Sequence, residues 1–125
     1  MALDLIAKFS VTEKVSAIDS REIFETFLAP DEEIVLSYKH IRDKVVFTTH
    51  KIICYDVQGF TGSKKEYRIF PYSKICSFSV ETAGFFDTDS DFKIWVSGVG
   101  VFEIKFGKRM DIKEVGSFMA SKISH

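Results

Sequence analysis

The spacing of the apolar residues changes twice along the chain. Up to about residue 30 they recur at helical intervals, and from about residue 31 to 108 they alternate with polar residues. From about residue 110 to 124 the helical interval returns. The pattern predicts an N-terminal helical extension over residues 1–30 and a mainly β domain over residues 31–125 that ends in an α-helix.

The N-terminal segment contains a start signal for a helix. Asp19 is placed as an N-cap, and Glu22 follows it at the spacing of a capping box. The predicted helix runs through Phe24 and Phe27 and stops before the first proline. The shorter amphipathic segment 3–9 predicts a further turn or two of helix.

Seven strands are expected in the middle segment. Each is a short run rich in apolar residues, bounded by polar or glycine-containing turns. The expected ranges are 34–39, 45–49, 52–57, 66–70, 75–82, 92–96 and 102–106. The second and third strands are apolar on both faces, so a further element must cover their outer side. That cover is either the N-terminal helix of the same chain or another subunit.

The last segment places its apolar residues on one stripe of a helix. They are Ile112, Val115, Met119 and Ile123. Seven antiparallel strands followed by one amphipathic helix predict two packed sheets, a sandwich or barrel, closed at one end by the C-terminal helix.

Four segments resemble the bacterial pleckstrin-homology (PH) domain family, formerly a domain of unknown function. They are residues 31–34 (DEEI), 47–53 (FTTHKII), 67–75 (YRIFPYSKI) and 91–95 (DFKIW). The resemblance runs from residue 31 to the C-terminus and implies a PH-like sandwich. It also implies assembly into closed homo-oligomeric rings, with no established ligand. These motifs are structural and specify the fold better than the function.

Length and charge exclude several classes of protein. A chain of 125 residues supports one domain, and its formal net charge of -1 provides no general field for nucleic acid, so no nucleic-acid partner is expected. No apolar run approaches the roughly 20 residues needed to span a bilayer. Asp4 comes before any run long enough for a signal peptide, so we expect a cytoplasmic protein. Cys54 and Cys76 lie in apolar runs and are expected to be buried, reduced thiols.

No pattern indicates catalysis. The sequence lacks the motifs of nucleophilic hydrolases, zinc proteases and P-loop enzymes. Of the three histidines, His40, His50 and His125, the second follows two threonines and is best explained as capping a turn. We therefore expect no catalytic residue, no cofactor and no enzyme activity.

An acidic loop has part of the spacing of a calcium site. Asp87, Asp89 and Asp91 stand at the first, third and fifth positions of an EF-hand loop. The sixth and twelfth positions require Gly and Glu, but Phe92 and Gly98 occupy them. The segment is better explained as a solvated hairpin loop, and no metal site is expected.

Basic residues gather in two expected hairpin loops. They are Lys39, Arg42 and Lys44 in the first loop, and Lys64 and Lys65 in the second. PH domains that bind inositol phosphates place Lys and Arg on these loops, so the resemblance makes the five residues a candidate anion site. Asp43 and Glu66 interrupt the clusters. An anionic lipid or phosphate ligand, and hence a membrane surface, is therefore the less favoured alternative.

Aromatic residues outside the expected core favour a contact surface. Trp95 points away from the inner face of its strand, and Phe85 and Phe86 fall in a loop. Phe24 and Phe27 lie on the N-terminal helix, which must bury its apolar side against something. We predict a homo-oligomer larger than a dimer, with other proteins as further candidate partners. Phe24, Phe27 and Trp95 are the candidate interface residues.

Overall fold

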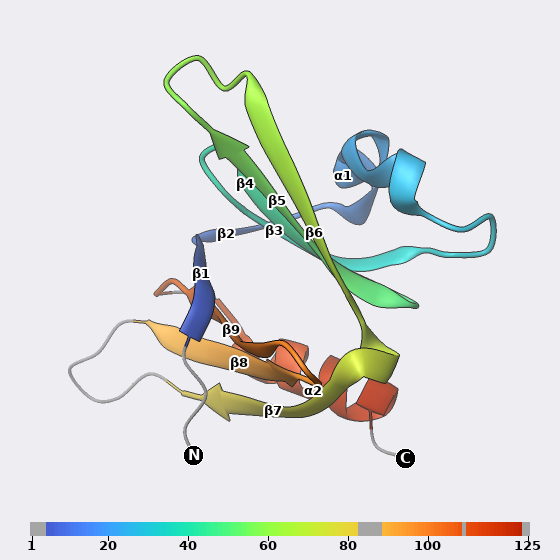
Figure 1. The fold of residues 1–125 in the computed structure, drawn as a ribbon, viewed down its shortest axis with the longest axis vertical. Helices are drawn as coiled ribbons and strands as arrows, with labels where there is room; N and C mark the ends of the chain where they lie inside the picture. The colour runs from blue at the N-terminus through green and yellow to red at the C-terminus, as the bar shows by residue number, and fades with distance from the viewer. Residues whose placement is uncertain (1–4, 83–88, 109, 124–125) are drawn as a thin grey trace. The chain divides into compact units, whose positions relative to one another are not determined.

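The computed structural model describes residues 5–82, 89–108 and 110–123 (Figure 1). Within these ranges the chain forms nine β-strands and two α-helices, together with two short 3-10 helices. The chain divides into two compact units. One unit is built from Met1–Thr12 and Tyr72–His125, and the other is the continuous segment Glu13–Pro71.

The continuous unit is built on a five-stranded antiparallel sheet with strand order β2-β3-β4-β5-β6. Its strands are β2 (Glu13–Val15), β3 (Ile34–His40), β4 (Asp43–Thr48), β5 (Lys51–Gln58) and β6 (Lys64–Pro71). β2 pairs only with the last part of β3, from Ser37 to Lys39. Helix α1 (Ala17–Phe24) and the 3-10 helix η1 (Glu25–Phe27) connect β2 to β3.

Helix α1 begins three residues earlier than the capping-box prediction placed it. Ser16 is the N-cap, and its hydroxyl accepts a hydrogen bond of 3.2 Å from the backbone N–H of Ile18. The prediction that Asp19 is the cap is therefore wrong. Asp19 lies in the first turn, where its carboxylate faces the partial positive charge of the helix N-terminus.

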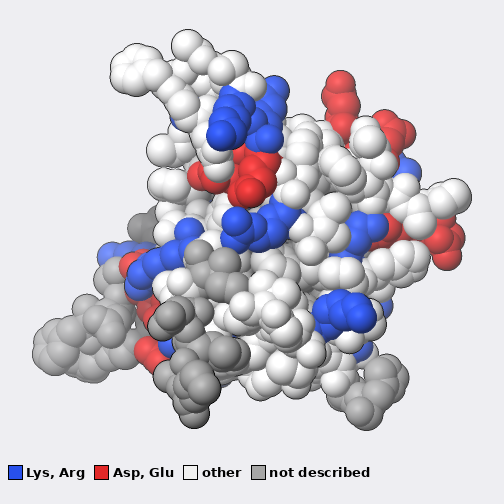
Figure 2. Space-filling model, viewed as in Figure 1, with Lys and Arg blue, Asp and Glu red and all other residues white. Residues whose placement is uncertain are grey.

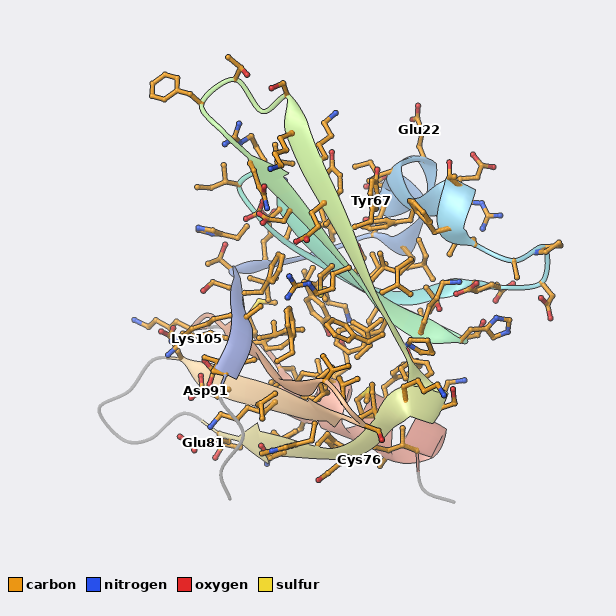
Figure 3. All side chains as sticks on the ribbon, in the orientation of Figure 1. Glu22, Tyr67, Cys76, Glu81, Asp91 and Lys105 are labelled. Atoms are coloured by element: carbon orange, nitrogen blue, oxygen red, sulfur yellow. The ribbon has the colours of Figure 1, made fainter. Side chains whose placement is uncertain are left out.

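Phe24 anchors α1 to one face of the five-stranded sheet. Its fully buried side chain forms a cluster with Val46, Ile53 and Tyr55. The hydroxyl of Tyr67 also donates a 3.2 Å hydrogen bond to the backbone oxygen of Ile23 (Figure 3). These contacts confirm that the helix covers the two-faced strands within the same chain. They also correct the interface prediction for Phe24, which has no exposed surface to offer a second chain.

The second unit contains a four-stranded sheet with strand order β1-β9-β8-β7. Its elements are β1 (Leu5–Val11), the 3-10 helix η2 (Tyr72–Lys74), β7 (Ile75–Glu81), β8 (Ser90–Val96), β9 (Gly100–Phe106) and helix α2 (Ile112–Ile123). Helix α2 packs on β7 and β8. It buries Ile112, Val115 and Met119, which confirms these three positions of the predicted stripe, whereas Ile123 is only partly buried.

The helix predicted over residues 3–9 is wrong, because Leu5–Val11 forms strand β1. β1 pairs in parallel with β9 at the other end of the chain, and the backbone N–H of Gly107 donates a 2.8 Å hydrogen bond to the oxygen of Val11. This distant pairing overrides the local helical spacing. The proposed boundary between residues 30 and 31 stays a prediction.

All seven predicted strands are present, as β3 to β9. The structure adds β1 and β2, so the described part of the chain has two more strands than expected, and one of them is parallel. β3 extends to His40, β4 begins at Asp43 and β6 begins at Lys64. Lys39, Lys44, Lys64 and Lys65 therefore belong to strands rather than loops. The strands form two separate hydrogen-bonded sheets, not one closed barrel.

Candidate interaction sites

Arg42 joins the two basic hairpins of the continuous unit. Its Nη2 atom donates a 3.4 Å hydrogen bond from the β3–β4 turn to the backbone oxygen of Gly59 in the β5–β6 loop. Gly62 of the same loop has a φ of 71°, and a Cβ atom there would lie 2.8 Å from Nη1 of Arg42. Glycine is needed here both for the backbone angle and for the close approach of the guanidinium.

The predicted anion-site residues lie toward the same end of the sheet. Lys39 and Lys44 pair across β3 and β4, while Lys64 and Lys65 pair with the last two residues of β5. Figure 2 shows positive side chains gathered over this end of the β5–β6 hairpin, with negative ones beside them. The structure therefore brings the five candidate residues to one end of the sheet. Their binding of an anion stays a prediction.

Carboxylates lie among these basic residues and reduce their combined charge. Asp43 Oδ1 accepts a 2.9 Å hydrogen bond from the backbone N–H of Val57. Asp56 and Glu66 pair across β5 and β6, and the Nζ atom of Lys39 lies 3.8 Å from Glu13 Oε2. The arrangement therefore offers a mixed-charge surface rather than a purely cationic pocket.

Two large apolar side chains are exposed at the same end of the sheet. Phe60 in the β5–β6 loop is fully exposed, and Ile41 in the β3–β4 turn is 79% exposed. Ile41 also has a φ of 54°, a left-handed conformation that is unfavourable for a β-branched residue. Our sequence analysis missed both residues. The available signal was an isolated aromatic residue in a loop of Gly, Ser, Thr and Lys.

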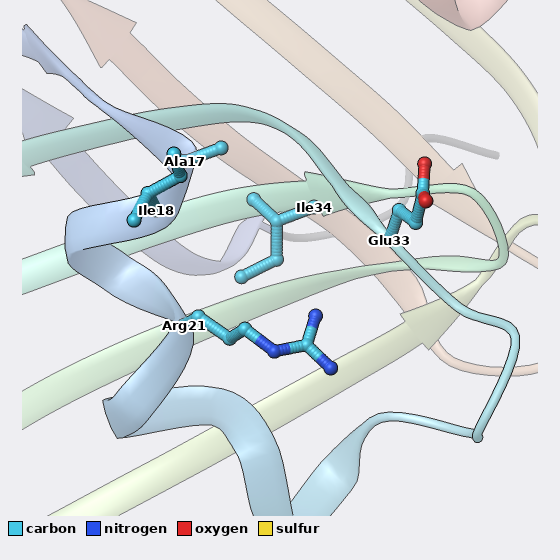
Figure 4. Close-up of a pocket in the computed structure, with 5 residues that line it drawn as sticks. All are labelled: Ala17, Ile18, Arg21, Glu33 and Ile34. Carbon is cyan, nitrogen blue, oxygen red and sulfur yellow. The ribbon is translucent and has the colours of Figure 1, made fainter.

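A pocket of about 190 Å³ lies between α1 and the start of β3 (Figure 4). It is lined by Ala17, Ile18, Arg21, Glu33 and Ile34. Ile34 also packs against the Phe24 cluster, whereas Ile18 is 84% exposed. The pocket therefore has an apolar floor and wall, with one positive and one negative side chain beside them. Sequence analysis did not find it.

The exposed charges around this pocket are mostly negative. The exposed acidic residues from α1 to the start of β3 are Asp19, Glu22, Glu25, Asp31 and Glu33. Arg21 is the one exposed basic residue in this described segment. Figure 2 shows negative side chains gathered over α1 and the loop that follows it.

Glu32, in the same loop, is buried and belongs to a structural network. Its carboxylate lies 2.7 Å from Lys51 Nζ, accepts a 2.9 Å hydrogen bond from the backbone N–H of Ala29, and is bonded by the hydroxyl of Thr48. Burial raises the pKa of Glu32, but the hydrogen bonds from Lys51, Thr48 and Ala29 outweigh it and leave the pKa below its ordinary value. His50 Nδ1 lies 3.6 Å from the same carboxylate, in the turn between β4 and β5. The structural interpretation of His50 therefore agrees with its position.

The remaining interface candidates differ in how much surface they present. Phe27 is partly buried, and its ring centroid lies 4.6 Å from that of Tyr67. Trp95 is half-buried, while Phe92, Ile94 and Val96 alternate with it as the buried face of β8. The contact role of Phe27 and Trp95 stays a prediction. Phe85 and Phe86 lie outside the described residues.

Charged side chains form pairs across the four-stranded sheet. Lys8 Nζ and Lys93 Nζ lie 3.4 and 3.9 Å from the Glu103 carboxylate, which stands between them on β9. Asp91 Oδ1 lies 3.5 Å from Lys105 Nζ on the neighbouring strand (Figure 3). Asp91 thus serves as an ion-pair partner within the sheet.

Among the described residues, no group of three or more His, Cys, Asp or Glu side chains is placed to hold a metal ion. Asp87 lies outside these residues, and Asp89 is exposed. His125 likewise lies outside the described residues.

The two cysteines have different environments. Cys54 is fully buried, and burial raises the pKa of its thiol. Cys76 is exposed on β7, so the prediction that both thiols are buried is wrong for this residue. The reason is the pairing of β7 with β8, which has an irregularity between Ile75 and Ser77 and leaves Cys76 facing outward.

Helices of the described ranges are all too short or too polar to cross a bilayer.

Comparison with known proteins identifies the family to which this fold belongs. Residues 4–123 match the family model described as Bacterial PH domain. The chain belongs to the bacterial PH domain family. The match starts before β1, so it includes the N-terminal strands and α1 as well as the region recognised from residue 31 onward.

Relatives and solved structures of bacterial PH domains agree with this assignment. Uncharacterized protein YjqA of Bacillus subtilis (strain 168) is 41% identical over 96 residues, covering 75% of this chain and 77% of that protein. Uncharacterized protein YozO of the same organism is 34% identical over 116 residues, covering 92% and 96%. The crystal structure of a DUF1696 family protein with a pleckstrin-homology domain from Shewanella loihica PV-4 has a TM-score of 0.81 and 33% identity, covering 89% of this chain and 96% of that one. The PH-like fold is therefore confirmed, and this fold supports a binding or scaffold module.

Proposed function

We propose that this bacterial PH domain is a non-catalytic binding and assembly module that forms a homo-oligomer larger than a dimer, most simply a ring. The observation that carries the proposal is the exposure of large apolar side chains at two separate places on the continuous unit. Phe60 and Ile41 stand at one end of the sheet, and Ile18 stands beside the α1 pocket. Exposed apolar groups of this kind mark protein contact surfaces.

Two different contact surfaces on one subunit favour a ring. When unlike surfaces meet, each new subunit leaves one of each free, and growth stops only when the rotation closes. Strand edges also support assembly: β6 forms one edge of its sheet, and β7 forms one edge of the other. Association of subunits protects such edges from uncontrolled pairing.

Light scattering coupled to size-exclusion chromatography tests the proposal. We expect the wild-type protein at micromolar concentration to have several times the 14.3 kDa mass of one chain. Trp95→Glu is expected to lower that mass while circular dichroism shows the same fold, because Trp95 is only half-buried. Val99→Glu serves as the control, since Val99 is exposed at a hairpin turn. A wild-type monomer would contradict the proposal.

A second candidate function is binding of anionic lipid or phosphate at the basic end of the sheet. The hydrogen bond from Arg42 to the β5–β6 loop favours it, because it brings the two basic hairpins together. Sedimentation with vesicles of phosphatidylglycerol and phosphatidylcholine is the test. We expect binding to fall with rising salt and to be lost in the Lys64→Glu, Lys65→Glu double variant. Equal binding by the double variant, or none by wild type, would exclude this candidate.

A further inference from the structure

We infer that subunits associate head to tail, with Phe60 of one copy inserted into the α1 pocket of the next. The apical loop, defined as residues 41–42 and 59–65, provides the inserting surface. The α1 pocket is lined by Ala17, Ile18, Arg21, Glu33 and Ile34. The inference rests on the proposed homo-oligomer and names the two surfaces that meet in it.

The apical loop presents Phe60 as a projecting aromatic group. The side chain of Phe60 is fully exposed. Burying its phenyl ring against a partner would therefore be favourable. Arg42 fixes the base of the loop through Gly59, and Gly62 packs closely against the same guanidinium. A loop held at its base loses less conformational entropy on binding, so Phe60 is suited to act as an anchor.

The α1 pocket has the size and lining that a phenyl group requires. Its volume is about 190 Å³. An apolar cavity of about 150 Å³ is large enough to bind benzene, so one phenylalanine ring fits. Ala17, Ile18 and Ile34 supply the apolar lining (Figure 4). The 84% exposure of Ile18 shows that this side chain has little cover within its own chain.

Charge complementarity identifies the occupant as a second copy of this chain. The apical loop carries the exposed side chains of Arg42, Lys64 and Lys65. Asp43 and Glu66 directly follow them, but segments 41–44 and 59–66 together hold four basic and two acidic residues, so this surface is positive on balance. The surface around the α1 pocket is mostly acidic, as the exposed carboxylates from Asp19 to Glu33 show. Opposite charges around a central apolar contact orient the partners and exclude other registers.

Phe60 cannot reach the pocket of its own chain in this fold. The pocket lies at the start of β3, beside Ile34, and the apical loop meets the other end of that strand at Ile41. A strand rises about 3.3 Å per residue, so the seven residues of β3 separate the two surfaces by roughly 20 Å. The contact must therefore join different subunits, and it uses unlike surfaces.

A mixing experiment with two complementary variants tests this contact. Phe60→Glu disables the inserting surface, and Ile18→Glu disables the pocket; both residues are exposed, so both variants should keep the fold. Loss of a central aromatic anchor is expected to raise the protein concentration needed for assembly about 30-fold or more. Each variant alone should therefore elute with the mass of a monomer at concentrations where wild type is oligomeric.

An equimolar mixture of the two variants should form dimers and nothing larger. The intact Phe60 of the pocket variant can enter the intact pocket of the Phe60 variant, after which both free surfaces are disabled. Val99→Glu, on an exposed residue outside both surfaces, is the matched control and should keep the wild-type mass. Circular dichroism of each variant checks that the fold is retained.

The possible outcomes separate this contact from the proposed function. An oligomeric wild type whose mass is unchanged by both variants would overturn the contact and leave the homo-oligomer standing. Two monomeric variants that do not form a dimer on mixing would also overturn it, because the two surfaces would then not be partners. A monomeric wild type would contradict both the contact and the homo-oligomer. Vesicle binding that requires Phe60 in such a monomer would assign the apical loop to membranes instead.

Discussion

Replacing Phe24 with alanine is expected to lower the free energy of unfolding by about 3–5 kcal/mol, the usual cost of truncating a buried phenylalanine. Phe24 is 0% exposed and packs with Val46, Ile53 and Tyr55. Alanine would leave a cavity between α1 and the sheet and weaken the attachment of the helix. Urea denaturation followed by fluorescence would measure the change, at one fixed protein concentration because association stabilises the folded subunit.

Val99→Ala is the control for this measurement. Val99 is 63% exposed, and truncating an exposed side chain usually changes stability by less than about 0.5 kcal/mol. A Phe24→Ala variant as stable as the control would show that the helix does not depend on this contact. Because residues of α1 line the pocket, loosening the helix would also disturb the pocket.

Replacing Glu32 with alanine is expected to lower the stability at neutral pH by about 3–5 kcal/mol, the range observed when one partner of a buried ion pair is removed. The substitution leaves Lys51, which is mostly buried, without its carboxylate, and removes the acceptors of Thr48 and of the Ala29 N–H. The loop between η1 and β3 would lose its side-chain network with the β4–β5 turn and keep the hydrogen bonds between Glu33 and Thr49. Urea denaturation of the variant at pH 7 measures this effect.

The same residue predicts how stability depends on pH. The folded-state pKa of Glu32 lies below its ordinary value of 4.5, so the ionised form stabilises the fold above pH 4.5. This contribution is lost as the pH falls through the folded-state pKa. Wild type should therefore lose stability on acidification, and Glu32→Gln should lose less. Glu33→Gln, which changes the exposed neighbouring carboxylate, is the control and should follow wild type. Parallel acid profiles for wild type and Glu32→Gln would contradict the assignment.

The strands that pair with near neighbours could be predicted from the sequence. β3 to β9 follow one another as hairpins or short connections, and their alternation is visible locally. β1 could not be recognised in the same way, because its partner β9 begins about ninety residues later. The apolar residues of the β1 segment are themselves spaced as in a helix. The cap was misplaced for a related reason: Ser16 and Asp19 are both good cap residues, and only the backbone conformation decides between them.

The candidate sites were only partly predictable. Basic residues at hairpin tips are visible in the sequence, and the PH resemblance placed the two hairpins together. The α1 pocket could not be predicted from the sequence. It depends on the distance between Ile18 and Ile34 in space, which is set when α1 packs on the sheet through Phe24. Residue type alone also does not distinguish the two phenylalanines, since Phe60 is fully exposed and Phe24 is fully buried.

The parallel pairing of β1 with β9 has a consequence for synthesis on the ribosome. The segment Glu13–Pro71 is continuous, so it can fold as soon as its last strand has emerged. β1 leaves the ribosome before this segment but must wait for β9 to be translated before its backbone groups find their partners. During elongation at roughly 5–20 residues per second, this strand is exposed for several seconds. β1 thus completes its native hydrogen bonding after most of the chain has been made, and until then it remains an unpaired strand of the nascent protein.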